Sequence, residues 1–145
     1  MMNTFTSEFQ SVIWVTLIYI LLYYVFLLHA LRVKLRVARR CKEAGEPFRR
    51  YTQHYPEILA VDRVQLNTLE HMPPFLVLMW LHAHIISPTS AAFLGAVYVA
   101  IRATYPLFLG SALHTSFPKR VFINTFSGYA ILVIFAAWQV QVLLC

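Results

Sequence analysis

Charged residues are scarce in this sequence. Lysine, arginine, aspartate and glutamate make up 12% of the 145 residues, whereas hydrophobic residues make up 59%. A soluble domain usually has about 25% charged residues. The shortage excludes an ordinary water-facing surface, so we expect most of the surface to face lipid. The length leaves room for a single domain, residues 1–145.

Cysteine is scarce too, and so are basic residues near the start of the chain. Cys41 and Cys145 lie far apart and form neither a CxxC pair nor a zinc-ligand spacing. This argues against a thiol oxidase, and we predict no metal site. The first apolar run has no basic residues before it and no small-residue cleavage site after it. We therefore expect it to stay as a membrane anchor rather than to be removed as a signal peptide.

Four long, weakly charged segments predict membrane-spanning helices and an all-α four-helix bundle. Residues 12–31 are apolar except for Thr16 and His29, and about 20 such residues cross the hydrocarbon core. Helix can continue through the basic residues that follow. The other spans are predicted at 57–86, 91–114 and 121–145, with a polar loop at 41–56. The adjacent prolines Pro73 and Pro74 are expected to kink the second span.

The net charge of +6 is concentrated beside membrane segments, which indicates anionic lipid rather than nucleic acid as the partner. The first and third loops carry lysine or arginine, whereas the segment before the first span and the second loop carry none. The positive-inside rule then predicts cytoplasmic first and third loops and both termini outside. Short loops favour a bacterial inner membrane.

Polar residues form a stripe on the second predicted span. Arg63, Asn67 and Glu70 are spaced i, i+4 and i+7, and His71 follows at i+8. Ionisable groups inside a membrane are costly, so they face a bundle interior and are functional candidates. Spacing alone leaves two readings open: an ion pair that holds helices together, or a ligand site.

A second stripe lies on the third span, where Tyr98, Arg102 and Tyr105 share the same spacing. Two such stripes facing each other would form a pocket for a small zwitterionic ligand with an excess of carboxylates. The tyrosines could equally serve packing, and the basic residues of the first helix could be interface anchors.

The stretch Arg63-Val-Gln-Leu-Asn-Thr-Leu-Glu-His-Met-Pro73 resembles the R-x-Q/H-x-N-x-x-E-x-x-P motif of the MAPEG family. This family comprises membrane-associated proteins of eicosanoid and glutathione metabolism, among them microsomal glutathione transferases. Residues 97–105 resemble its third-helix pattern, V-Y/G-x-x-x-R-x-x-H/Y. The resemblance implies a homotrimer that holds glutathione, as cosubstrate, at each protomer interface near the cytoplasm.

The resemblance also implies residue roles. Glutathione contacts would come from Arg63, Gln65, Asn67, Glu70, His71, Arg102 and Tyr105, with Lys34 or Arg36 from the first helix. Gln65 lies off the stripe and would reach the ligand from the helix flank, across a subunit boundary. Arg120 would activate the glutathione thiol toward a hydrophobic electrophile or lipid hydroperoxide that arrives through the bilayer.

This sequence departs from the family pattern at four points. His71 replaces a frequent tyrosine, Leu109 replaces another, Pro106 lies within the third helix, and Arg120 follows Tyr105 at a longer spacing. A non-enzymatic ligand-binding or scaffold protein is therefore a second hypothesis. Further alternatives are a haem cytochrome that uses His29, His71 or His114, and a small multidrug exporter with a lone membrane carboxylate.

Overall fold

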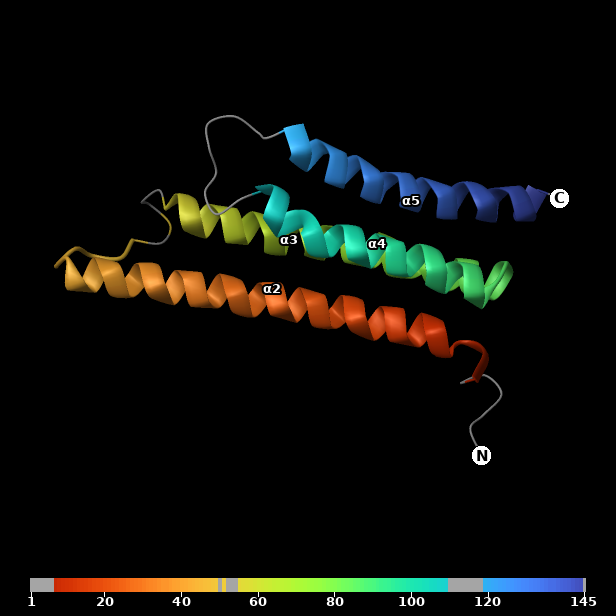
Figure 1. Ribbon diagram of the computed structural model, residues 1–145, viewed down its shortest axis with the longest axis horizontal. Helices are drawn as coiled ribbons and strands as arrows, with labels where there is room; N and C mark the ends of the chain where they lie inside the picture. Colours follow the sequence, from red (N-terminus) through yellow and green to blue (C-terminus); the bar gives the residue numbers. More distant parts are fainter. Residues whose placement is uncertain (1–6, 50, 52–54, 110–118, 145) are drawn as a thin grey trace.

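The computed structural model describes residues 7–49, 51, 55–109 and 119–144. This part of the chain contains no strand and forms four long helices: α2 (Gln10–Glu43), α3 (Pro56–Ile85), α4 (Pro88–Leu109) and α5 (Lys119–Leu144). The helices lie along one common axis, with α2 and α5 on opposite sides of α3 and α4 (Figure 1). Both α3 and α4 contact the other three helices, so this pair forms the centre of the bundle.

The basic end of the bundle is built where α2 finishes. This helix continues beyond its apolar run to Glu43, and Arg40 and Lys42 in its last turn complement the negative end of the helix dipole. Cys41 is buried in that turn rather than in the expected loop, with its Sγ 3.6 Å from the hydroxyl of Tyr55. This hydrogen bond raises the pKa of Tyr55 above its ordinary value.

Two prolines do not interrupt α3. The helix begins with Pro56, a position where proline lacks no needed hydrogen bond. It then runs without a break through Pro73 and Pro74 to Ile85. Neither internal proline has an N–H, so the carbonyls one turn earlier lose their helical partners.

Three described helices are long and apolar enough to cross a membrane: α2, α4, and α5 from Phe122 onward. The helix α3 is not among them, because charged residues fill its first half and prolines and histidines interrupt its second. The sequence predicts α3 as a fourth span and extends the third to residue 114. That predicted end, with His114, lies outside the described residues.

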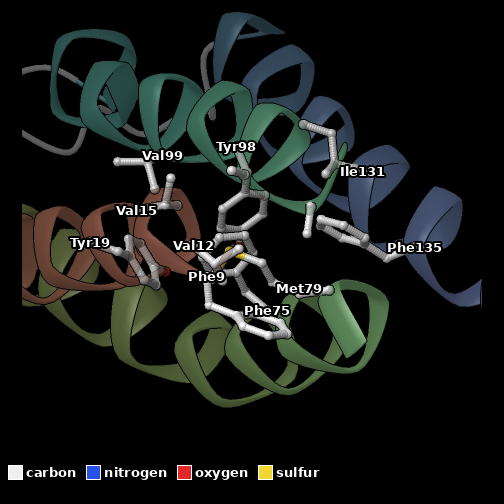
Figure 2. Packing of buried hydrophobic residues seen from close by; sticks show 13 residues of the cluster. Phe9, Val12, Val15, Tyr19, Phe75, Met79, Tyr98, Val99, Ile131 and Phe135 are labelled. Atoms are coloured by element: carbon white, nitrogen blue, oxygen red, sulfur yellow. The ribbon is translucent and has the colours of Figure 1, made fainter. Parts of the chain in front are cut away.

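A cluster of apolar side chains fills the end of the bundle where α2 begins and α5 finishes (Figure 2). All four helices contribute, as Tyr19, Phe75, Tyr98 and Phe135 show; each is fully buried. The buried positions of each helix recur every three or four residues, which places them on one face. Large apolar side chains also cover the outward faces, as lipid contact requires.

Hydrogen bonds between polar side chains and neighbouring helices fix this packing. Gln139 on α5 donates to the carbonyl of Leu78 at 2.7 Å. Asn124 donates to the carbonyl of Ile101 and to the hydroxyl of Thr104, both at 2.8 Å. Within the hydrocarbon core of a membrane no water is available to these polar groups, so such bonds provide their hydrogen-bond partners. They also fix α5 against the central pair.

Candidate functional site

Arg102 is the centre of the polar cluster. Its side chain is completely buried, although arginine is almost never fully buried unless it is paired. Nη1 donates to Oδ1 of Asn67 on α3 at 2.7 Å, and Nε donates to the hydroxyl of Tyr98 at 3.2 Å. The stripe on α3 and the stripe on α4 therefore face each other across the centre of the bundle.

The helix α5 packs against the guanidinium at Gly128. A Cβ at Gly128 would lie 3.6 Å from Nη2 of Arg102 and 3.6 Å from the ring of Tyr98. Within the described part of the chain, Nη2 has no hydrogen-bond partner. A buried donor without an acceptor is costly. Arg102 thus retains capacity for one further acceptor.

Other predicted residues surround this guanidinium. Tyr105 is buried one turn later on α4, where the charges of Arg63, Glu70 and Arg102 all act on its phenol. His71 is buried on α3 and packs edge-on against the ring of Tyr129, with centroids 4.9 Å apart. Asn67, His71, Arg102 and Tyr105 thus lie together between α3, α4 and α5, and Arg63 and Glu70 are exposed on the adjoining flank of α3.

Gln65 and Lys34 lie apart from that group. Lys34 on α2 forms an ion pair with Asp62 on α3 at 2.5 Å. Gln65 follows Asp62 by three residues and therefore lies on the same flank of α3. At about 100° per residue, this flank points well away from Arg63 and Glu70. A single chain therefore does not bring Gln65 to the other six, and its reach across a subunit boundary stays a prediction.

Arg36 lines a cleft that lies apart from Arg102. A cleft of about 570 Å³ lies between the C-terminal half of α2, the start of α3 and the end of α4. Its walls combine apolar and charged side chains: Phe26, His29, Val33, Arg36, Val37, Arg40, Glu57, Ala60, Val61, Val64, Pro106 and Leu107. Phe26 and Val64 in these walls also pack with Tyr105 and Leu109 in one apolar cluster. No residue of the Arg102 cluster lines the cleft, so the two sites are distinct, although Tyr105 packs against two of the wall residues.

Arg120 lies in the first turn of α5, and its side chain is outside the described residues. Its role in thiol activation stays a prediction. Sequence reasoning missed Tyr129, which contacts His71. No motif marked Tyr129, because one tyrosine in an apolar span resembles an ordinary packing residue. Tyr98 was recognised on its stripe but not assigned to the site, although its hydroxyl accepts a hydrogen bond from Arg102.

The apolar helices and the buried polar cluster between them define a helical integral membrane protein. The MAPEG family matches residues 11–140. The chain therefore belongs to this family, as the motif that starts at Arg63 predicts. No curated protein matches the chain.

Proposed function

We propose that this protein is a glutathione-dependent membrane transferase or peroxidase that acts on hydrophobic electrophiles or lipid hydroperoxides. The observation that carries the proposal is the buried Arg102 guanidinium. Asn67 and Tyr98 hold it in place, and Nη2 remains without a partner among the described residues. Family membership supports the same function, because MAPEG proteins include glutathione transferases.

The chemistry of glutathione suits this cluster. The tripeptide carries two carboxylates, one ammonium group, two amides and a thiol. Arginine binds carboxylates through paired hydrogen bonds, so Arg63 and Arg102 would hold them. Glu70 would take the ammonium group, and Asn67 and Tyr105 offer further hydrogen-bonding groups. Arg63 and Glu70 are exposed and can meet a ligand directly, whereas Arg102 is buried beneath them.

Catalysis would require the thiolate of glutathione, because the thiolate is the nucleophile. With an aryl halide, the sulfur attacks the ring carbon, the C–S bond forms, and the carbon–halogen bond breaks. Halide leaves and the thiol proton passes to water. An arginine beside the sulfur that lowers the thiol pKa by ~2 units would contribute about 2.7 kcal/mol. Arg120 is the candidate for this role.

The proposed assembly is a homotrimer in a bacterial inner membrane, with both termini outside and the site toward the cytoplasm. The end of α2 and the start of α3 lie toward one end of the bundle, and α5 starts from the same side but further in (Figure 1). That end carries the clustered arginines and lysines that favour the cytoplasmic side. In a trimer, the flank with Lys34 and Gln65 would contribute to the ligand site of a neighbouring protomer.

Calorimetry with glutathione on the detergent-purified protein tests the ligand, and native mass spectrometry tests the trimer. Turnover of a model aryl halide and of one lipid hydroperoxide tests the reaction. We expect binding, turnover and a trimeric mass. Binding without turnover would favour the non-enzymatic ligand-binding protein, and absence of binding would contradict the proposal. A Soret band in the purified protein would point to the haem cytochrome instead.

A further inference from the structure

We propose that the cleft between α2, α3 and the end of α4 binds one acyl chain that carries an anionic headgroup. The cleft contains about 570 Å³, within the roughly 300–1,000 Å³ typical of small-molecule sites. No residue of the Arg102 cluster lines the cleft, and the proposal does not depend on glutathione. It assigns Arg36 to the headgroup and leaves Lys34, which does not line the cleft, as the first-helix candidate for glutathione.

The cleft is polar at one end and apolar at the other. Along α2, the lining residues run from Phe26 to Arg40, a distance of about 21 Å at 1.5 Å per residue. Arg36 and Arg40 lie near the end of the helix, whereas Phe26 lies deeper in the bundle. The elongated shape and the graded polarity match an amphiphile that lies parallel to the helices with its charge at the basic end.

The walls of the deeper part suit an acyl chain. Val33, Val64 and Ala60 are buried and form an apolar floor. Leu107 is 80% exposed beside them, so the end of α4 presents a large apolar side chain at the edge of this floor. An acyl chain would cover this surface and would gain the dispersion contacts that the bare cleft lacks.

The charged residues at the basic end of the cleft, Arg36, Arg40 and Glu57, form its rim and favour an anionic headgroup. Among the described residues, Glu57 is the one carboxylate that lines the cleft, and it already binds Arg40 through an ion pair of 3.2 Å. Arg36 is exposed and has no ion-pair partner among the described residues. A carboxylate or phosphate headgroup would receive the charge-assisted hydrogen bonds that Arg36 leaves available.

The test uses the detergent-purified full chain and native mass spectrometry with three added ligands. Dioleoyl phosphatidylglycerol, oleate and dioleoyl phosphatidylcholine share the same acyl chain and differ in headgroup. We expect retention of the anionic ligands over phosphatidylcholine. Preference for phosphatidylglycerol identifies a membrane lipid as the source, and preference for oleate identifies a free fatty acid. Equal retention of all three, or of none, overturns the proposal.

Matched variants separate the cleft from general surface charge. Arg36→Gln with Arg40→Gln removes two charges from the rim, and Arg39→Gln with Lys42→Gln removes two from the same stretch of helix outside the cleft. We expect the first pair to lower apparent affinity for the anionic ligand about tenfold or more and the second to lower it far less. Equal losses would indicate non-specific attraction and would overturn the site.

The single variant Arg36→Gln distinguishes a loss of ligand contact from a folding defect. Arg36 is exposed and takes part in neither of the side-chain ion pairs of the described chain. We therefore expect this variant to keep the helical circular dichroism and elution volume of the wild type while it retains less anionic ligand. Full retention by a folded Arg36→Gln protein would overturn the role of the cationic rim.

Discussion

Asn67 on α3 and Arg102 on α4 are joined by a hydrogen bond of 2.7 Å between the amide oxygen and Nη1. The bond links the two central helices where Arg102 has no access to solvent. It orients the guanidinium and leaves Nη2 unpaired within the described chain, so it would serve the proposed ligand site as well as the packing. A polar stripe on α3 that holds helices together is therefore compatible with a stripe that binds a ligand.

The pair should show strong energetic coupling. Arg102→Ala leaves the Asn67 amide oxygen buried without its donor, and a buried polar group left unpaired costs about 1–3 kcal/mol. We expect each single alanine variant to destabilise the protein and the double variant to cost less than the sum, with a coupling of about 0.5–3 kcal/mol. Reversible unfolding in mixed detergent measures this cycle. Strict additivity would show that the bond contributes nothing.

Gly95 should tolerate no side chain. A Cβ there would lie 2.7 Å from Sδ of Met79 and 3.0 Å from Cγ1 of Val15, and Met79 is fully buried. We expect Gly95→Ala to destabilise the bundle by about 1–3 kcal/mol, as overpacking usually does. The same unfolding measurement applies.

Gly128→Ala is the matched control for Gly95→Ala. Its Cβ would meet Arg102 and Tyr98 at 3.6 Å, an ordinary contact, and alanine favours a helix by up to about 1 kcal/mol over glycine. We expect unchanged or slightly higher stability. Equal losses at both glycines would contradict the close approach of α4 to its neighbours at Gly95.

The arrangement of the polar stripes could be predicted from the sequence because helical spacing is a local property. Residues spaced i, i+4 and i+7 share a helix face wherever that helix lies. Burial cost then forces charged faces inward, so Asn67 and Arg102 meet. The extension of α2 to Glu43 is also a local property, because the arginine and lysine residues of its last turns are good helix formers.

Contacts that depend on tertiary packing could not be predicted in this way. Pro73 and Pro74 remove two backbone donors from α3, yet the helix continues through both, and its contacts with three neighbouring helices depend on the whole fold. Tyr129 meets His71 only through the register of α5 against α3, which no local pattern encodes. Cys41 looked like a loop residue because its surroundings are polar, but one face of that turn is buried.

Arg63 and Glu70 should be needed for glutathione affinity and not for folding. Both are exposed on the flank of α3, so their replacement leaves the core intact. Loss of one charge-assisted contact costs about 1.5–3 kcal/mol, which predicts that Arg63→Gln or Glu70→Gln weakens binding roughly 10- to 100-fold by calorimetry.

Exposed residues of the same types outside the cluster provide the controls for this measurement. Arg49→Gln and Glu43→Gln remove the same charges near the α2–α3 connection, and we expect wild-type affinity from both. Equal weakening by the control variants would show that overall charge, and not the stripe, determines affinity.

Arg120 offers the sharpest test of catalysis. If Arg120 lowers the thiol pKa of bound glutathione from about 8.5 by ~2 units, Arg120→Ala should reduce the thiolate fraction, and with it the conjugation of an aryl halide, roughly 25-fold near pH 7. The affinity for glutathione should change little, because the carboxylates are held elsewhere. Lys119→Ala, which removes the neighbouring charge in the same helical turn, should remain active.

The pH profile distinguishes thiol activation by Arg120 from a structural role. Loss of Arg120 raises the thiol pKa toward about 8.5, so the variant needs a higher pH to form the same fraction of thiolate. We therefore expect its activity to recover between roughly pH 7 and 9, where the wild type has already levelled off. A variant that merely misfolds would stay inactive at every pH. Full activity of Arg120→Ala at pH 7 would remove this residue from the mechanism and leave the Arg102 cluster as a binding site alone.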